Sequence, residues 1–169
     1  CASRQLEEVT FRRTVIPVQE LLDAAGKYFK KLIKNRPERI ELEIEPMEAK
    51  VIGDVNQLRF LLENLIDEAL TVREDGVIRL QARKDNEYVR FLFTDTRREK
   101  SVEELNQLFY PNLARMTSGE KGELRGTEYL VCKQIIRDHD EFAGRRGCRI
   151  NAEPAEGGGF TVYFTIPRR

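Results

Sequence analysis

The sequence has one histidine, His139, no tryptophan, and no excess of charge of either sign. Its 29 lysines and arginines equal its 29 aspartates and glutamates. It therefore lacks the basic excess typical of a nucleic-acid-binding module, and we expect no nucleic-acid partner. No apolar run reaches the roughly 20 residues that a membrane-spanning helix needs. The three cysteines, at positions 1, 132 and 148, lack metal-ligand spacing and are odd in number, which argues against a disulfide framework and indicates a reducing compartment.

The 169 residues suffice for one large domain, with 40% hydrophobic residues to form a core and 34% charged residues spread along the chain. The chain begins with Cys1 and shows no leader, so we interpret it as a piece of a longer protein. The first 14 residues lack a sustained hydrophobic period and are expected to be the tail of a preceding segment. One domain is expected over residues 15–169.

Hydrophobic periodicity predicts three longer helices. Apolar residues recur at helical spacing from Val18 to Ile33, from Val55 to about Val72, and from Thr127 to Asp138. Asp54 precedes the second of these helices and can cap its free N–H groups. A short helical segment is expected at about residues 102–109.

Alternation of polar and apolar residues predicts the strands. The expected strands cover residues 39–45, 50–53, 77–83, 88–94, 148–152 and 160–166. The order of elements predicts an α+β fold: a two-layer α/β sandwich in which a mixed five-stranded sheet carries about three helices on one face.

Five segments resemble, in order, motifs of the ATP-binding domain of sensor histidine kinases. They are residues 54–69 (the N-box helix), 91–95 (the strand ending in the adenine-binding aspartate), 108–111 (the F-box), 126–139 (the helix after the last glycine box) and 150–167 (the closing hairpin). The match extends over about residues 15–167. It implies the Bergerat ATP-binding (GHKL) fold shared by histidine kinases, gyrase, mismatch-repair ATPases and heat-shock chaperones. Residues 1–14 would then end a dimerisation or linker segment.

The resemblance also implies an ATP pocket. Its residues would be Asn64, Glu68, Asp95, Arg97, Gly126 and Thr127. In the family, the position of Glu68 is an asparagine that holds the Mg²⁺ bridging the triphosphate. A glutamate is a hard oxygen ligand that can still bind Mg²⁺, but it also brings a negative charge to the phosphates. Two interpretations of Glu68 stay open: a Mg²⁺ ligand, or a helix-surface carboxylate near Arg59 or Arg73.

Most glycines that let the family's backbone approach the nucleotide are missing. Asp95 is followed by Thr96, Arg97, Arg98 and Glu99. The two arginines are expected to obstruct the pocket, to turn away from it, or to replace a phosphate or ribose contact. Of the last glycine box only Gly126 remains, and Glu128 in the first turn of the next helix competes with a phosphate for the helix N-terminus.

Four further features have a plain structural interpretation. Residues 117–122 suit a lid or a solvated loop. His139 lies at a helix end that the family does not phosphorylate, and a structural, partly exposed role is expected for it. Residues 140–147 are locally basic, which suits a solvated loop or a docking site for an acidic partner. Cys132 is expected to be a small core residue.

These departures favour a degenerate domain of a histidine-kinase-like signalling protein, with weak or no ATP binding and a regulatory or partner-binding role in a two-component system. The alternative is an active Mg-ATP-dependent domain that phosphorylates a histidine on a separate dimerisation domain in a phosphorelay, where catalysis rests on positioning and charge neutralisation. A different ATPase of this fold is disfavoured, because Asn64 occupies the turn where a general-base glutamate is needed.

Cofactors, partners and location follow from the resemblance alone. The implied cofactors are ATP and Mg²⁺, and the missing groups argue against their binding. The implied partners are the histidine-containing dimerisation domain of the same protein, in a full-length homodimer, and a response regulator. The implied location is cytoplasmic, within a full-length protein that another segment can anchor in a membrane.

Overall fold

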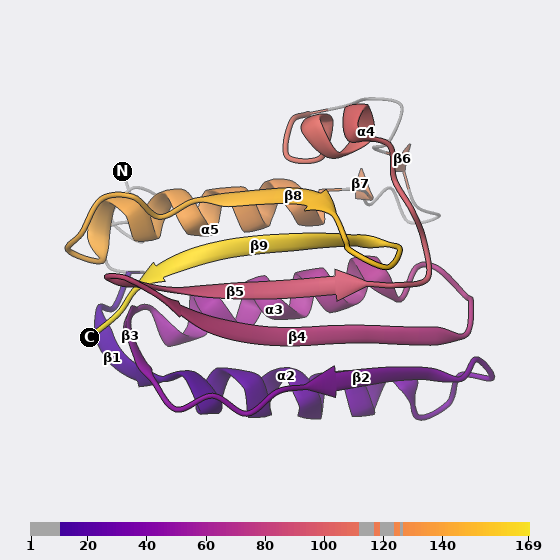
Figure 1. Cartoon of the computed structure of the whole chain (residues 1–169), viewed down its shortest axis with the longest axis horizontal. Helices are drawn as coiled ribbons and strands as arrows, with labels where there is room; N and C mark the ends of the chain where they lie inside the picture. The colour runs from indigo at the N-terminus through magenta and orange to yellow at the C-terminus, as the bar shows by residue number, and fades with distance from the viewer. Residues whose placement is uncertain (1–10, 112–116, 119–123, 126) are drawn as a thin grey trace.

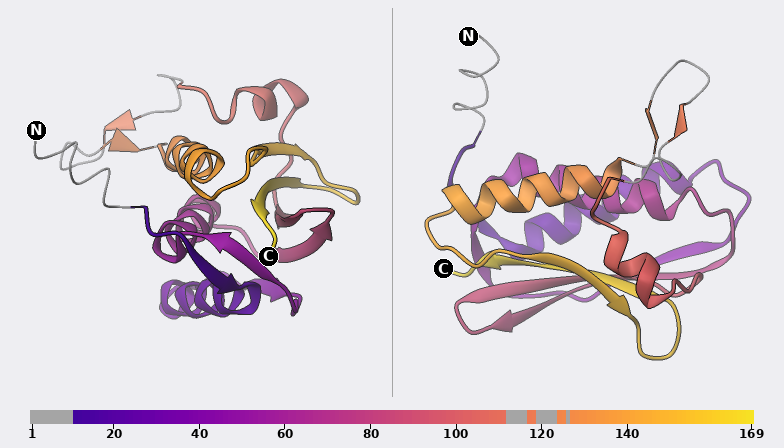
Figure 2. Two further views of the ribbon diagram at one scale, coloured as in Figure 1. Left: turned by 90° about the vertical axis from the view of Figure 1, so that its left-hand side faces the viewer. Right: turned by 90° about the horizontal axis from the view of Figure 1, so that it is seen from above.

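A mixed sheet of five strands forms one layer of the protein. The helices at residues 18–33, 55–69 and 128–142 form the other layer (Figures 1 and 2). The structure is a computed structural model and describes residues 11–111, 117–118, 124–125 and 127–169. The helices are α2 (Val18–Ile33), α3 (Val55–Ala69), α4 (Val102–Gln107) and α5 (Glu128–Phe142). The strands are β1 (Thr14–Pro17), β2 (Ile40–Ile44), β3 (Lys50–Gly53), β4 (Gly76–Asp85), β5 (Tyr88–Asp95), β6 (Thr117–Ser118), β7 (Leu124–Arg125), β8 (Ile150–Pro154) and β9 (Phe160–Pro167). Within these residues, none of the helices has the length and apolar content needed to span a membrane.

The strands of the main sheet follow the order β2-β4-β5-β9-β8. Strand β2 runs parallel to β4, and the other neighbours are antiparallel. The predicted α+β sandwich with a mixed sheet of five strands is confirmed, as are the four helical segments. Two short pairings, β1 with β3 and β6 with β7, were not expected from the sequence.

The core lies between the two layers. On the central strand β5, Val89, Phe91 and Phe93 are buried against the helices, which is the inward half of its alternation. Phe91 stacks on Phe164 of the neighbouring β9 with ring centroids 4.9 Å apart. The helices bury the stripes that their periodicity predicts, and Cys132 of α5 is fully buried, as expected.

Helices α3 and α5 pack against each other. The start of α3 and the end of α5 lie at one end of the molecule, on the left in Figure 1. Asp54 caps α3 as predicted, because its Oδ1 accepts hydrogen bonds from the N–H groups of Asn56 and Gln57. The last turn of α3, the first turn of α5 and the end of β5 lie together at the opposite end, on the right in Figure 1. The candidate site is at that end.

Candidate functional site

Strand β5 ends at Asp95, which is 4% exposed although its side chain carries a carboxylate. The turn between β8 and β9 lies against this end of β5. A Cβ added to Gly159 would be 2.1 Å from the carbonyl oxygen of Asp95, so only glycine fits there. The fold therefore places the predicted adenine-binding aspartate in the interior, at the junction of β5, β9 and the helices.

The Asp95 carboxylate is bound by the side chain of Arg97. Nε of Arg97 donates to Oδ1 at 2.9 Å, and Nη2 donates to Oδ2 at 2.9 Å. Oδ1 also accepts a hydrogen bond from the backbone N–H of Arg97 at 3.0 Å. The two side chains are only 1% and 5% exposed. A two-pronged contact of this kind is the strongest geometry for a pair of arginine and carboxylate. In this arrangement the aspartate is already occupied by a cation of the same chain.

The same guanidinium group also completes the end of α3. Its remaining three N–H groups donate to the carbonyl oxygens of Ala69 at 2.5 Å, Val72 at 3.0 Å and Glu74 at 3.0 Å. A guanidinium group has five N–H donors, and all five are used here. The last carbonyls of a helix have no partner within the helix. Backbone N–H groups of Leu70, Thr71 and Val72 donate to those of Ile66, Glu68 and Ala69, and Arg97 adds side-chain donors at the same end.

Two carboxyl groups meet beside this pair, from Glu68 in the last turn of α3 and Glu128 at the start of α5. Burial, and next the negative charge of Glu128, raise the pKa of Glu68 to about 7. The cationic groups of Lys100 and Arg98 act in the opposite direction. Oε2 of Glu128 is buried and has no hydrogen-bond partner among the residues that the structure describes. Two carboxyl groups so placed cannot both be ionised without cost, and Glu68 carries a proton over part of the neutral range.

A small cavity lies between the end of α3, the start of α5 and the strands β5 and β9. It is lined by Leu65, Glu68, Ala69, Val72, Phe93, Asp95, Arg98, Lys100, Tyr129, Phe160 and Val162. Its volume is about 20 Å³, which is room for about one water molecule. Pockets that bind small molecules usually measure roughly 300–1,000 Å³. The cavity as it stands does not admit a nucleotide.

The structure brings three of the six predicted pocket residues together at the cavity. Glu68 and Asp95 line the cavity, and Arg97 covers Asp95. Asn64 turns its amide back along α3, where Nδ2 donates to the carbonyl oxygen of Phe60 at 2.7 Å. Thr127 is the residue before α5, and its side chain makes no capping hydrogen bond. Gly126 lies outside the described residues, as do residues 119–122 of the expected lid.

Two expectations about neighbouring side chains were wrong. Glu68 is not a surface carboxylate near Arg59 or Arg73, since its charged neighbours are Glu128, Lys100 and Arg98, and Arg73 Nη1 instead lies 3.2 Å from Glu38 Oε1. His139 is not partly exposed, since it is fully buried.

His139 joins α5 to the start of α3. Nδ1 of its ring lies 2.8 Å from the carbonyl oxygen of Ile135, and Nε2 accepts the backbone N–H of Asp54 at 3.0 Å. These partners define a neutral ring with its proton on Nδ1, and burial lowers its pKa. The ring of Phe11 packs on it edge-on at 4.8 Å. His139 is thus a structural residue at the end of the molecule opposite the cavity.

Nucleotide binding needs open space, and the cavity offers little of it. Among the described residues, no group of three or more His, Cys, Asp or Glu side chains is arranged to hold a metal ion. The carboxyl groups of Glu68 and Glu128 are the two oxygen ligands at the predicted Mg²⁺ position, and they share that place with Lys100 and Arg98. As the structure stands, Asp95 is bound by Arg97 and the cavity beside it has a volume of about 20 Å³.

Comparison with known proteins gives two kinds of match. Residues 53–169 match the family model described as histidine kinase-, DNA gyrase B-, and HSP90-like ATPase. No curated protein sequence matches the chain. Among solved structures, the catalytic domain of histidine kinase ThkA in a nucleotide-free form superposes with a TM-score of 0.70 and 22% identity, covering 93% of this chain and 97% of that one.

Two further structures are similar. The mycobacterial sensor histidine kinase MprB superposes with a TM-score of 0.71 and 18% identity, covering 94% of this chain and 99% of that chain. ThkA in complex with the response regulator protein TrrA gives a TM-score of 0.69 and 20% identity, with 99% of this chain covered and 46% of the other. At these identities the superpositions show a common fold.

Proposed function

The chain belongs to the family of histidine kinase-, DNA gyrase B- and HSP90-like ATPases, and we propose that it is a degenerate histidine-kinase domain that binds ATP weakly or not at all. In this proposal the domain is retained for its shape and surface, as a regulatory or partner-binding module of a two-component signalling protein. Its fold is that of histidine kinase catalytic domains.

One observation carries the proposal: the Asp95 carboxylate is bound on both oxygens by Arg97. For Asp95 to accept an adenine amino group, this contact would have to open. Opening would leave the buried guanidinium group of Arg97 without its carboxylate. Loss of one partner from a buried ion pair costs roughly 3–5 kcal/mol. ATP would have to supply that free energy before it gained any affinity.

The phosphate end of the site supports the same conclusion. Glu68 and Glu128 place carboxyl groups where the family has a Mg²⁺ ligand and a helix N-terminus open to phosphate. A triphosphate brought there would face like charge, and the helix N-terminus already has a carboxylate of its own in Glu128. Arg98 and Lys100 offset this charge only in part, since the pKa of Glu68 remains raised.

A thermal-shift titration with ATP and ADP, each with and without Mg²⁺, tests the proposal. A ligand at about 100 times its dissociation constant stabilises a protein by roughly 2.7 kcal/mol, which is readily seen as a rise in unfolding temperature. We expect no rise at millimolar nucleotide. A Mg²⁺-dependent rise would contradict the proposal and restore the active kinase domain as the interpretation. A rise that does not need Mg²⁺ would also contradict it, and would indicate nucleotide sensing without phosphoryl transfer.

The proposed partners are those of a histidine-kinase domain. They are the histidine-containing dimerisation domain of the same protein, in a homodimer, and a response regulator. The complex of ThkA with the response regulator TrrA, whose kinase chain is similar in fold to this one, supports the second partner. We place the domain in the cytoplasm, within a longer protein that another segment can anchor to a membrane.

A further inference from the structure

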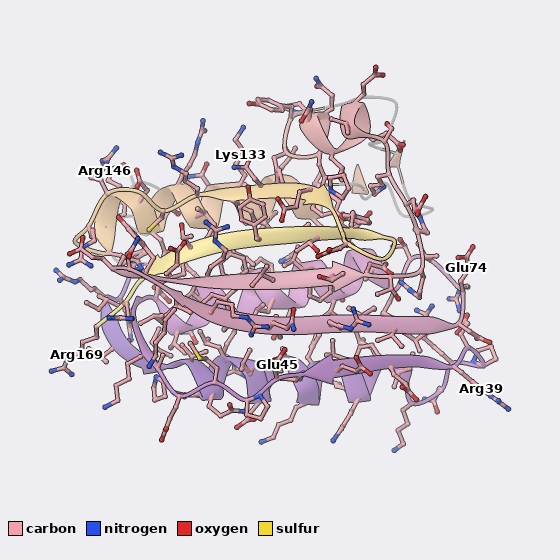
Figure 3. All side chains as sticks on the ribbon, in the orientation of Figure 1. Arg39, Glu45, Glu74, Lys133, Arg146 and Arg169 are labelled. Carbon is pink, nitrogen blue, oxygen red and sulfur yellow. The ribbon has the colours of Figure 1, made fainter. Side chains whose placement is uncertain are left out.

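One end of the molecule gathers cationic side chains, all but one of them exposed, although the chain as a whole is neutral. This end lies on the left in Figure 1, where α5 ends, the turn between β4 and β5 lies, and the chain reaches its C-terminus. We define the cationic surface by six residues: Arg13, Lys50, Arg145, Arg146, Arg168 and Arg169. Figure 3 labels Arg146 and Arg169 at this end.

Contacts within the chain bring these residues to one surface. The guanidinium group of Arg13 lies against Gly144, where an added Cβ would be 2.7 Å from Nη2. Arg145 and Arg168 both reach the carbonyl oxygen of Glu87, through Nη1 at 3.0 Å and the backbone N–H at 2.8 Å. The N–H of Arg169 donates to the carbonyl oxygen of Lys50 at 3.0 Å. Cations from four distant parts of the chain therefore meet here.

Two carboxylates inside this surface are already engaged. Oε1 of Glu87 lies 3.8 Å from Nη2 of Arg145, and Oδ2 of Asp140 lies 3.2 Å from Nε of Arg146. Exposed pairs of this kind contribute little to stability. The side chains of Arg13, Lys50, Arg168 and Arg169 make no ion pair with any residue that the structure describes. Positive charge thus exceeds negative charge at this surface.

The loop that carries Arg145 and Arg146 is held in one conformation. Oδ1 of Asp140 accepts the N–H groups of Gly147 at 2.5 Å and Cys148 at 3.0 Å. The hydroxyl of Tyr88 donates to the carbonyl oxygen of Arg146, and φ of Gly147 is +114°, which favours glycine. These bonds hold the loop backbone, so Arg145 and Arg146 leave it at defined positions, and their planar guanidinium groups suit pairing with carboxylates.

This arrangement favours a protein partner over a lipid surface. A bilayer of anionic lipids attracts cations without regard to their spacing, and the carboxylates of Glu87, Asp140 and exposed Glu141 would face it unfavourably. Phe142, which is 51% exposed, adds an aromatic side chain beside the arginines. Arginine and aromatic residues are the types that concentrate binding free energy in interfaces between proteins.

We propose that the cationic surface binds a carboxylate-rich segment, with several Asp and Glu residues, of a partner protein. The inference rests on the proposed partner-binding role and names the surface and the chemistry of the partner. It does not depend on the state of the nucleotide site, which lies at the other end of the molecule.

Fluorescence anisotropy with a labelled peptide of alternating Asp and Glu tests this proposal, with an Asn and Gln peptide of equal length for comparison. The test variant is Arg146→Ala with Arg168→Ala and Arg169→Ala. The matched control is Lys27→Ala with Lys30→Ala and Lys31→Ala, which removes three exposed cations from α2. Vesicles containing phosphatidylserine form a separate arm. Each sample is also titrated with Mg-ATP, so that the two proposals are judged separately.

We expect saturable binding of the acidic peptide, about tenfold weaker in the test variant and changed less than about twofold in the control, where tenfold corresponds to 1.4 kcal/mol. Raising the salt concentration should also weaken it. If the triple variant loses its thermal unfolding transition, Arg169→Ala alone must show a loss in the same direction. Absence of peptide binding, equal losses in both variants, or binding to vesicles without binding to the peptide would each overturn the proposal. Mg-ATP binding with intact peptide binding would overturn only the proposed function.

Discussion

Gly76 and Arg97 share one small space: a Cβ added to Gly76 would lie 2.5 Å from Cγ of Arg97. Gly76 opens β4, and its φ of +143° is one that other residues rarely adopt. The side chain of Arg97 can pass between β4 and the end of α3 only because position 76 has no side chain. Occupation of Asp95 thus depends on a residue that precedes it by nearly twenty positions.

Gly76→Ala should therefore destabilise the protein through two effects. One is backbone strain at positive φ, and the other is a collision with an arginine that five hydrogen bonds hold in place. Gly157→Ala is a matched control, since φ of Gly157 is +88° but an added Cβ there meets nothing within 4 Å. We expect the control to lose about 1 kcal/mol of unfolding free energy and Gly76→Ala to lose roughly 1–3 kcal/mol more. Urea denaturation measures both, and equal losses would contradict the packing described.

Arg97→Met should lose about 3 kcal/mol or more of unfolding free energy, because it leaves Asp95 buried without its cation and removes the hydrogen bonds to the carbonyl oxygens of Ala69 and Val72. Arg59→Met is the control, because Arg59 is exposed on α3 and its loss should change stability by less than about 0.5 kcal/mol. Chemical denaturation of the two variants gives the comparison. If Arg97→Met were as stable as Arg59→Met, the contacts of Arg97 would have no structural weight.

The main elements could be predicted from the sequence because each follows from local pattern. Helix α2 has an uninterrupted amphipathic period, α3 adds the capping residue Asp54, and the β4–β5 hairpin alternates around a polar turn. Strand β1 has only four residues, and its partner β3 lies more than thirty positions away, so no local signal marks it.

The site was harder to predict, since its geometry is set by contacts between distant residues. The motif comparison found Glu68, Asp95 and Arg97. It could not show that the guanidinium group of Arg97 would reach the carbonyl oxygens of Ala69 and Val72. No sequence signal marks this contact, because backbone N–H groups that follow α3 already donate to its last carbonyl oxygens. No sequence signal marks the burial of His139, because its ring binds the N–H group of Asp54, a residue far away in the sequence.

Glu68 should make stability fall as pH rises. Its pKa in the folded protein, about 7, lies above the ordinary value of 4.5. The folded state therefore holds the proton more tightly, and this contribution is fully present below about pH 4.5 and is lost as pH rises through about 7. Glu68→Gln, which is neutral throughout, should gain on the order of 2 kcal/mol relative to the wild type at about pH 8 and little at low pH.

Urea denaturation across this pH range measures the difference between Glu68→Gln and the wild type. Glu63→Gln, one turn earlier on the same helix, provides the control and should run parallel to the wild type. A constant offset for Glu68→Gln at all pH values would contradict the pairing of Glu68 with Glu128.

His139 should have the opposite pH dependence. Burial lowers its pKa in the folded protein, so its contribution is present above the ordinary value of about 6.5 and is lost as pH falls. His139→Leu removes the acceptor of the Asp54 N–H group and should lose about 1–3 kcal/mol at neutral pH, with a weaker dependence on acid. Arg137→Leu, an exposed change on the same helix, is the control. An acid dependence that persisted in His139→Leu would assign it to another group.

The most direct test follows the Nε–H signal of Arg97 by NMR in protein labelled with ¹⁵N-arginine, during titration with Mg-ATP. Arg97→Lys, which lacks this group, assigns the signal. A buried and hydrogen-bonded Nε–H exchanges slowly with water. We expect a protected Arg97 signal that stays in place to millimolar Mg-ATP. A saturable shift of the signal, or loss of its protection on addition of Mg-ATP, would show that nucleotide displaces Arg97 from Asp95 and would contradict the account.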